Sequence, residues 1–216
     1  MDETEPLDDL RVLTVSEIPP PALLRRQLCA DREDARTVRR ARTGVHDILM
    51  RKDGRLFVVV GPCSVHDPHA ALEYARKLAE CARRLSGELL IAMRVYFEKP
   101  RTTIGWKGLI NDPGLDGSCR IVEGLALARG LLLDITRMGL PVATEFLDPM
   151  TPEYIVDLVS WGAIGARTVE SQVHRQIASA LSCPVGFKNG SSGDVAVAVE
   201  AVLSARFGHQ FLSHTR

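Results

Sequence analysis

Residues 89–113 read LLIAMRVYFEKPRTTIGWKGLINDP, and this stretch decides the fold. The apolar run at 89–93 predicts a buried strand that extends to residue 97. Prolines and glycines then interrupt the pattern, so the rest of the stretch is expected to form a long loop. The cations of this loop can hold an anion, because guanidinium groups match phosphate and carboxylate; a solvated basic loop is the alternative. These cations are Arg94, Lys99, Arg101 and Lys107.

The composition is that of an ordinary globular protein with one core. Of its 216 residues, 45% are hydrophobic and 25% are charged, and the chain has a formal net charge of +0. This balance argues against a nucleic-acid partner or a membrane surface, so an anion site must be local. The acidic N-terminus lacks the apolar segment of a signal peptide. Scattered cysteines without CxxC pairs are typical of reduced thiols, which favours a cytoplasmic location.

Short apolar runs alternate with amphipathic segments along most of the chain. This alternation predicts right-handed βαβ units and a parallel sheet. Neither a GxGxxG after the first strand nor a P-loop motif is present, which disfavours nucleotide-binding folds. We expect strands at 56–60 (buried on both faces), 89–97, 141–146, 163–169, 184–188 and 210–213. We expect helices at 22–28, 32–50, 67–85, 120–138, 151–161, 171–181 and 194–206.

The predicted fold class is α/β, a (β/α)8 TIM barrel. Residues 1–30 are expected to form an N-terminal arm with an oligomeric or regulatory role, and residues 31–216 a partial barrel. Because residue 216 comes just after the sixth predicted strand, we expect the barrel to be truncated there; a fold other than a barrel is the alternative.

Ionisable groups or thiols follow five of the predicted strands. The carboxyl ends of barrel strands build the active site, so these side chains are candidates for chemistry. Each alone is compatible with a structural salt bridge, and a cysteine there can ligate a metal, act as a nucleophile or simply pack as a small hydrophobic residue. Together they bring an excess of cations to one place, which an anionic ligand would neutralise. The residues are Cys63, Arg94, Lys99, Glu145, Arg167 and Lys188.

Several motifs resemble class I 3-deoxy-D-arabino-heptulosonate 7-phosphate (DAHP) synthases over nearly the whole chain. The resemblance implies a (β/α)8 barrel and a divalent metal ion such as Mn²⁺ or Fe²⁺. It also implies condensation of phosphoenolpyruvate with D-erythrose 4-phosphate to DAHP and phosphate, the first step of the shikimate pathway. The motifs are Gly61–Ser64, Met93–Thr102, Gly105–Gly108, Gly162–Thr168, Glu170–Gln172 and Pro184–Gly190.

The resemblance also implies roles for individual residues. Cys63 would ligate the metal, Glu145 would orient a water molecule, and Lys99 would deliver a proton. The other metal ligands of the family, a His, a Glu and an Asp, lie on later strands, and His214 does not match the motif of the ligand histidine. Phosphoenolpyruvate would bind Arg94, Lys99, Arg167 and Lys188, and erythrose 4-phosphate would bind Pro100, Arg101 and Thr102.

An aromatic amino acid inhibits many members of this family, and the resemblance implies a pocket for it and a homo-oligomer. Two alternatives remain: a non-catalytic module that docks on full-length subunits through the arm, and a synthase that uses another phosphorylated aldose. Taken alone, the 216-residue chain is expected to be inactive and poorly soluble. The inhibitor pocket would comprise Asp8, Asp9, Phe146, Asp148, Pro152, Ser182, Phe211 and Ser213.

Overall fold

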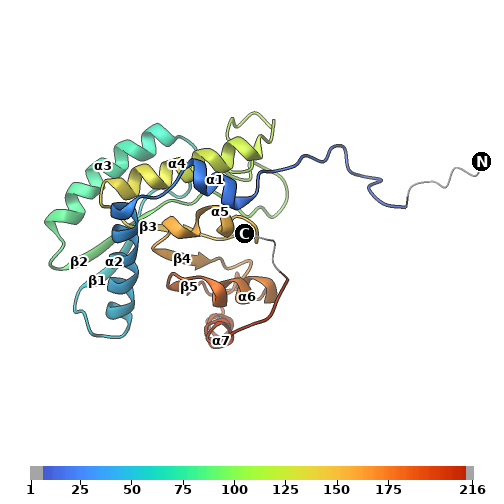
Figure 1. Ribbon diagram of the computed structural model, residues 1–216. Helices are drawn as coiled ribbons and strands as arrows, with labels where there is room; N and C mark the ends of the chain where they lie inside the picture. The colour runs from blue at the N-terminus through green and yellow to red at the C-terminus, as the bar shows by residue number, and fades with distance from the viewer. Residues whose placement is uncertain (1–6, 213–216) are drawn as a thin grey trace, which may run out of the picture.

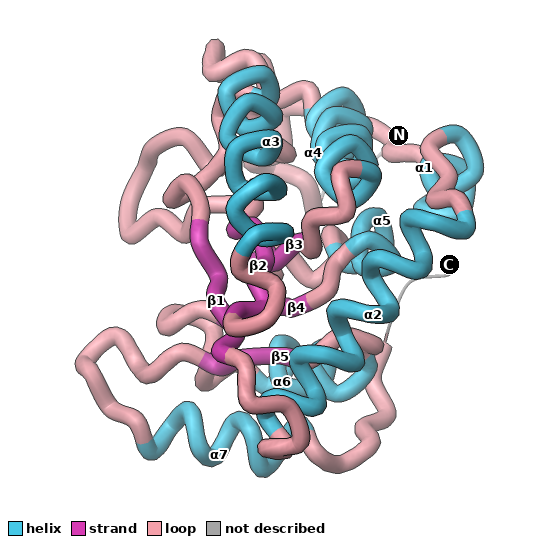
Figure 2. The backbone as a smooth tube through the Cα atoms, turned by 90° about the vertical axis from the view of Figure 1, so that its left-hand side faces the viewer, coloured by secondary structure: helices cyan, strands magenta, loops and turns pink. Residues whose placement is uncertain are grey.

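The computed structural model describes residues 7–212 and contains a curled, five-stranded parallel sheet (Figure 2). Its strands pair in chain order, so each lies beside the next one along the sequence. Parallel neighbours need crossover connections, and helices supply them. The sheet and its helices form the predicted partial (β/α)8 barrel. The strands are β1 (Leu56–Val60), β2 (Leu89–Arg94), β3 (Val142–Glu145), β4 (Trp161–Ile164) and β5 (Val185–Phe187).

Helices follow the strands and cover the outer face of the curled sheet (Figure 1). Their starts are encoded locally: the Asp31 side chain caps α2, and the Asp67 side chain accepts hydrogen bonds from the first turn of α3. No helix among residues 7–212 is long and apolar enough to cross a membrane. The helices are α1 (Pro21–Gln27), α2 (Arg32–Leu49), α3 (Pro68–Arg84), α4 (Ile121–Arg137), α5 (Pro152–Ile155), α6 (Gln172–Ala180) and α7 (Ala196–Ala205), with a 3-10 turn, η1 (Val156–Leu158).

Several predictions about the elements are wrong. β2 ends at Arg94 rather than at residue 97, and β4 spans Trp161–Ile164 rather than residues 163–169. The segment 151–161 is not one helix, because α5 gives way to η1 and Trp161 already belongs to β4. Thr151 does not cap α5. The predicted sixth strand is not formed at residues 210–212, the part of it that the structure describes. These residues instead run past α6 toward α5, where Phe211 and Leu212 line a cavity (Figure 1).

β1 was expected to be buried on both faces and is not. Its three central residues are half-buried, whereas Leu56 and Val60 are exposed. The reason is its place in the sheet, since within residues 7–212 β1 pairs with β2 alone. An apolar edge strand of this kind presents unpaired backbone groups and is prone to association.

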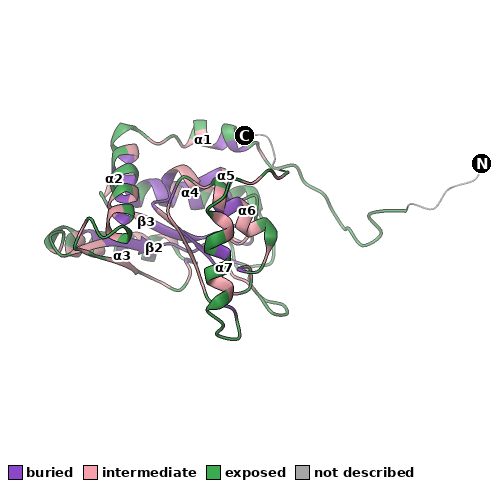
Figure 3. Ribbon diagram, turned by 90° about the horizontal axis from the view of Figure 1, so that it is seen from below, coloured by how far each residue is buried: buried purple, intermediate pink, exposed green. Residues whose placement is uncertain are grey.

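The hydrophobic core lies between the sheet and the helices outside it (Figure 3). Met93 of β2 and Val142 of β3 are fully buried, and they form a cluster with Leu132 and Ile135 of α4. Burying a side chain of this size contributes about 1.5–3 kcal/mol. This packing fixes α4 against the middle of the sheet.

The segment before α1 extends away from the barrel (Figure 1). Residues 12–20 form neither helix nor strand, and Leu7, Leu13 and Val15 are almost fully exposed.

All five cysteines are free thiols, as the scattered spacing predicted.

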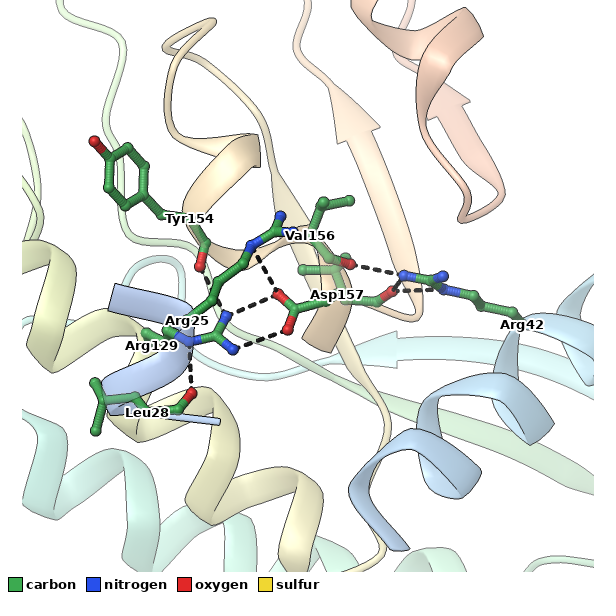
Figure 4. Close-up of polar contacts among 8 residues, drawn as sticks. Arg25, Leu28, Arg42, Arg129, Tyr154, Val156 and Asp157 are labelled. Atoms are coloured by element: carbon green, nitrogen blue, oxygen red, sulfur yellow. Dashed lines mark hydrogen bonds and ion pairs between the residues drawn. The ribbon is translucent and has the colours of Figure 1, made fainter. Parts of the chain in front are cut away.

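A buried cation, Arg129 of α4, joins three parts of the chain (Figure 4). Its guanidinium donates hydrogen bonds of 2.7–2.8 Å to the carbonyls of Leu28 and Tyr154 and to both carboxylate oxygens of Asp157. Burial opposes ionisation of Asp157, but the hydrogen bonds and charge of Arg129 outweigh it and hold the pKa of Asp157 below its ordinary value. Arg129 thereby ties α4 to η1 and to the end of α1.

A second arginine ties α2 to the same region (Figure 4). Arg42 donates to the carbonyls of Val156 and Val159 at distances of 2.7–3.0 Å. These carbonyls belong to η1 and to the turn that leads into β4, which lack the regular bonding of a longer helix. The planar guanidinium reaches both at once, so α2 is anchored where the chain enters β4.

We expect Asp157→Asn to lower the free energy of unfolding by about 2–4 kcal/mol, because it leaves the buried Arg129 charge without a counter-charge. The expected loss of unfolding free energy is smaller than for a fully buried pair, because the Asp157 side chain is about one-third exposed. Glu73→Gln, which breaks the exposed Lys77–Glu73 pair, is the control and should leave stability unchanged. Urea unfolding followed by circular dichroism measures both. Equal midpoints for the two variants would show that the Arg129–Asp157 pair does not hold these elements.

Candidate active site

The carboxyl ends of the strands meet at one end of the sheet. In the register of the sheet, Arg94 pairs with Ala143 and Glu145 pairs with Ala163. The turns that follow β1, β4 and β5 open at the same end, because all neighbouring strands are parallel. Lys188 follows β5 directly. Side chains that are far apart in the sequence are thereby brought together.

Cys63 lies between two of these cations. The Lys99 ammonium donates to the Cys63 sulfur at 3.1 Å, and the Arg94 guanidinium donates to the Cys63 carbonyl at 3.0 Å. The hydrogen bond and charge of Lys99 hold the pKa of the Cys63 thiol below its ordinary value. Lys99 therefore makes it easier for this exposed thiol to form the thiolate, which is the form that acts as a nucleophile or metal ligand.

The buried ring of Tyr96 supports two cations. The Arg94 guanidinium lies 3.8 Å from the ring centroid, and the Lys188 ammonium lies 5.4 Å from it. Both distances suit cation–π attraction. Burial raises the pKa of Tyr96 to about 12, so its hydroxyl stays neutral beside them. The Nε of Arg94 is buried and has no hydrogen-bond partner among residues 7–212.

Glu145 pairs with Lys188. The carboxylate is buried and accepts a hydrogen bond of 2.7 Å from the Lys188 ammonium. The contact depends on Gly165 after β4, since a Cβ there would lie 2.3 Å from a Glu145 oxygen. Gly165 thus makes room for a carboxylate of the protein itself.

The loop after β2 closes on itself and then contacts the loop after β4. The Lys99 backbone N–H donates to the Lys107 carbonyl, and the Arg101 side chain donates to the Trp106 carbonyl. Arg167 reaches the Thr102 hydroxyl at 3.3 Å. Side chains of the two predicted substrate groups are therefore in contact.

Gly108 makes the closure of this loop possible. It pairs with Glu98 in an isolated antiparallel bridge, and its φ of 118° lies in the region that favours glycine. A Cβ at this position would lie 1.9 Å from the Phe97 carbonyl oxygen. Gly108 therefore determines how the cationic loop returns to the barrel.

Glu98 is a buried carboxyl group that the sequence analysis did not single out. It is 6% exposed, and its oxygens accept hydrogen bonds from the backbone N–H groups of Leu147 and Asp148. Burial, and then the charge of Asp148, raise its pKa to about 7. The position of Glu98 between Phe97 and Lys99 could have indicated a buried acid. An acid beside a buried aromatic residue needs polar partners if it is buried too.

His174 holds the same segment from α6. Its Nε2 lies 2.7 Å from the Leu147 carbonyl and its Nδ1 lies 2.8 Å from the Ser171 hydroxyl. Since a carbonyl only accepts, Nε2 carries the proton. Through these contacts His174 connects α6 to the segment after β3.

A cavity of about 690 Å3 lies beside α5 and α6. Among the residues predicted for the inhibitor pocket, Pro152, Ser182 and Phe211 line it. Phe146 is instead buried in the core, and Asp148 is exposed. Asp8 and Asp9 lie on the exposed arm, whereas Ser213 lies outside the described residues. The sequence analysis missed several apolar residues that line the cavity. One is Val156 of η1. The others, Val173, Ile177 and Leu181, recur every four residues along α6 and the position that follows it, and this helical spacing was the available signal.

The described residues do not form a metal site by themselves. Among residues 7–212, no group of three or more His, Cys, Asp or Glu side chains is placed to hold a metal ion. The Cys63 thiolate is a suitable donor for an ion such as Fe²⁺, which accepts sulfur ligands. Cys63 thus fits the role of one ligand among several.

These features define a class: α/β-barrel proteins with a cluster of cationic side chains at the carboxyl ends of parallel strands. The family model described as the DAHP synthetase I family matches residues 30–216, and the chain belongs to this family.

Curated relatives agree with this assignment. The chain is 58% identical over 209 residues to the Phe-sensitive phospho-2-dehydro-3-deoxyheptonate aldolase of Escherichia coli K12, covering 97% of this chain and 60% of the relative. It is 53% identical over 206 residues to the Trp-sensitive aldolase of Buchnera aphidicola from Acyrthosiphon pisum, covering 95% and 59%. The chain thus spans about 60% of the length of these relatives.

A solved structure supports the fold. The phospho-2-dehydro-3-deoxyheptonate aldolase of Francisella tularensis SCHU S4 superimposes with a TM-score of 0.93 at 56% identity. The match covers 94% of this chain and 60% of that chain. The curled sheet is therefore the corresponding part of a known barrel.

We expect Lys99→Met to slow alkylation of Cys63 by iodoacetamide at neutral pH by roughly threefold to tenfold, because loss of the ammonium raises the thiol pKa. Lys107→Met is the control, since it removes an exposed charge from the same loop without touching the thiol. Mass spectrometry in a chelating buffer follows Cys63, with exposed Cys119 as internal reference. Equal rates in both variants would show that Lys99 does not activate Cys63.

Proposed function

We propose that this chain is the N-terminal part of an enzyme that condenses phosphoenolpyruvate with D-erythrose 4-phosphate to DAHP and phosphate. This reaction is the first step of the shikimate pathway, which leads to the aromatic amino acids. The carrying observation is the cluster of Arg94, Lys99 and Lys188 around Cys63 and Tyr96. Membership of the DAHP synthetase I family supports the proposal.

The charge balance of the cluster favours a highly anionic substrate. Glu145 neutralises Lys188, and the Cys63 sulfur accepts from Lys99, but no carboxylate among the described residues is paired with Arg94. Phosphoenolpyruvate carries a phosphate and a carboxylate, which together match several cations. In this proposal it binds Arg94, Lys99, Arg167 and Lys188.

Erythrose 4-phosphate has its own group of residues, Pro100, Arg101 and Thr102, on the exposed part of the cationic loop. The contact between Thr102 and Arg167 supports this division, because side chains of the two proposed groups then meet, as a bimolecular reaction requires. The C3 carbon of phosphoenolpyruvate attacks the aldehyde carbon, Lys99 delivers a proton to the forming hydroxyl, and water oriented by Glu145 adds at C2. Cleavage of the C–O bond at C2 then releases phosphate.

A divalent metal ion, Mn²⁺ or Fe²⁺, is the cofactor of this proposal, with Cys63 as one of its ligands. When bound, the ion supplies Lewis-acid polarisation of the aldehyde. The low thiol pKa supports this role because only the thiolate coordinates a metal.

The cavity beside α5 and α6 is proposed to bind an aromatic amino acid that inhibits the enzyme. Its volume is in the range of small-molecule sites, and its lining combines apolar side chains with Arg25, Arg42 and Glu153. The names of the relatives, Phe-sensitive and Trp-sensitive, support regulation by such a ligand. The exposed apolar residues of the arm support a homo-oligomer in which the arm packs against a second copy.

The test of function is an assay of the complete barrel with both substrates and Mn²⁺. DAHP formation with erythrose 4-phosphate, and not with a five-carbon phosphorylated aldose, is the expected result. Absence of product with either aldose would refute the proposal.

We expect Arg94→Ala to weaken phosphoenolpyruvate binding more than erythrose 4-phosphate binding, and Arg101→Ala to do the reverse. Each lost charge-assisted hydrogen bond costs roughly 1.5–3 kcal/mol of binding free energy. Arg84→Ala on α3 removes an exposed arginine that lies outside the cluster, and it serves as the control. Calorimetric titration with each substrate measures the effects. Similar losses for both substrates in both variants would contradict the division of roles.

A further inference from the structure

Arg94 is held in place without being neutralised. Its guanidinium donates to the Cys63 carbonyl at 3.0 Å and lies 3.8 Å from the centroid of the Tyr96 ring. Within the part of the chain that the structure describes, no carboxylate is paired with it. A carbonyl oxygen and an aromatic face orient a cation but carry no formal negative charge. The charge of Arg94 therefore stays available to an anionic ligand.

Lys188 shares the Tyr96 ring but has a second support. Its ammonium lies 5.4 Å from the ring centroid and donates to the Glu145 carboxylate at 2.7 Å. An anionic ligand has to compete with Glu145 for this lysine, because both offer charged oxygens. The ring contact can persist while an anion binds, since the ring has no charge for the anion to repel or replace.

The ring is anchored through the backbone on both sides. Tyr96 is 4% exposed, and its carbonyl accepts a hydrogen bond of 2.8 Å from the N–H of Val65, in the segment between β1 and α3. The preceding residue, Val95, is bound to β3. Its N–H donates to the Ala143 carbonyl at 2.8 Å, and its carbonyl accepts from the Thr144 hydroxyl at 2.7 Å. The ring is therefore a rigid support for the two cations.

The hydroxyl group of Tyr96 does not supply a counter-charge. Burial raises the pKa of Tyr96 to about 12, so the phenol is neutral at physiological pH. The attraction to the cations then comes from the ring face, which tyrosine and phenylalanine both offer.

A rigid support matters because the arginine side chain is flexible. A guanidinium that is free to move loses rotamer freedom when a ligand orders it, and this loss weakens binding. The ring orders Arg94 before a ligand arrives, so the entropic cost falls on folding rather than on binding.

We propose that Tyr96 is a positioning residue, whose ring face holds Arg94 and Lys188 in the arrangement that binds phosphoenolpyruvate. The inference rests on the proposed function, because it concerns the affinity for that substrate. Tyr96 acts through the two cations. The site uses the negative face of the ring, rather than its hydroxyl group or its volume.

The first test measures phosphoenolpyruvate binding to the complete barrel by calorimetry. Tyr96→Leu keeps an apolar side chain but removes the ring face, and the dissociation constant should rise roughly threefold to thirtyfold. Tyr96→Phe keeps the ring and should bind within about twofold of the wild type. Tyr74→Leu is the matched control. It removes a tyrosine of α3 that is 37% exposed, and it should bind as the wild type does.

A graded series separates the electrostatics of the ring from its packing. Tyr96 is replaced by phenylalanine and by mono-, di- and trifluorinated phenylalanine, which keep nearly the same shape while the negative ring face weakens with each fluorine. The dissociation constant for phosphoenolpyruvate should rise stepwise along the series. Circular dichroism shows whether Tyr96→Leu folds, and the fluorinated series decides the question if it does not.

Steady-state kinetics give a further readout. The ring orders the cations before and during the reaction, so its loss removes binding that ground state and transition state share. In Tyr96→Leu and in the trifluorinated variant, KM for phosphoenolpyruvate should rise while kcat changes less. KM for erythrose 4-phosphate should stay within about twofold of the wild-type value.

Three results would overturn the proposal. Equal dissociation constants along the fluorinated series would show that Tyr96 only fills space. Equal losses in Tyr96→Phe and Tyr96→Leu would assign the role to the hydroxyl group. Parallel losses for both substrates would mean that Tyr96 maintains the whole site rather than Arg94 and Lys188. A wild type that binds no phosphoenolpyruvate is a different result, because it refutes the proposed function and the inference with it.

Discussion

The parallel pairing of β2 between β1 and β3 is the constraint on which the site depends. It places the ends of neighbouring strands at one edge, so that the turn after β1 and the loop after β2 meet there. Antiparallel pairing would send alternate strand ends to opposite edges and separate Cys63 from Arg94. The contacts of Cys63 with Arg94 and Lys99 follow from this arrangement rather than from proximity in the sequence.

The same pairing creates an electrostatic problem, because it concentrates cations in a small volume. The protein offsets part of the repulsion with Glu145, with the Cys63 thiolate and with the face of the Tyr96 ring. The unpartnered Nε of Arg94 shows that the compensation is incomplete. A site of this kind is poised for an anion, since the ligand supplies the charge that the protein lacks.

Away from the strand ends, buried polar groups determine how the outer elements are placed. Arg129 and Arg42 bind carbonyls of segments too short to satisfy their own backbone, and Glu98 does the same with N–H groups of the segment after β3. Each group is costly to bury alone and is satisfied in only one arrangement of its partners. These contacts therefore give the helices and loops beside the cavity a defined position.

The sequence by itself determined the βαβ alternation and the cationic loop, because apolar periodicity and glycine or proline breaks are local signals. It also identified Cys63 and the cations, through motifs that resemble a known family. It did not determine that α5 stops after one turn, that β1 is partly exposed, or that residues 210–212 leave the sheet.

Only the tertiary structure decided those features, and it alone revealed Glu98, because partners distant in the sequence made the difference. The Glu98 carboxyl accepts from backbone N–H groups about 50 residues away in the sequence, at Leu147 and Asp148. The exposure of β1 depends on whether a second neighbouring strand is present. Burial and long-range hydrogen bonding are properties of the folded chain, and no local pattern of residues encodes them.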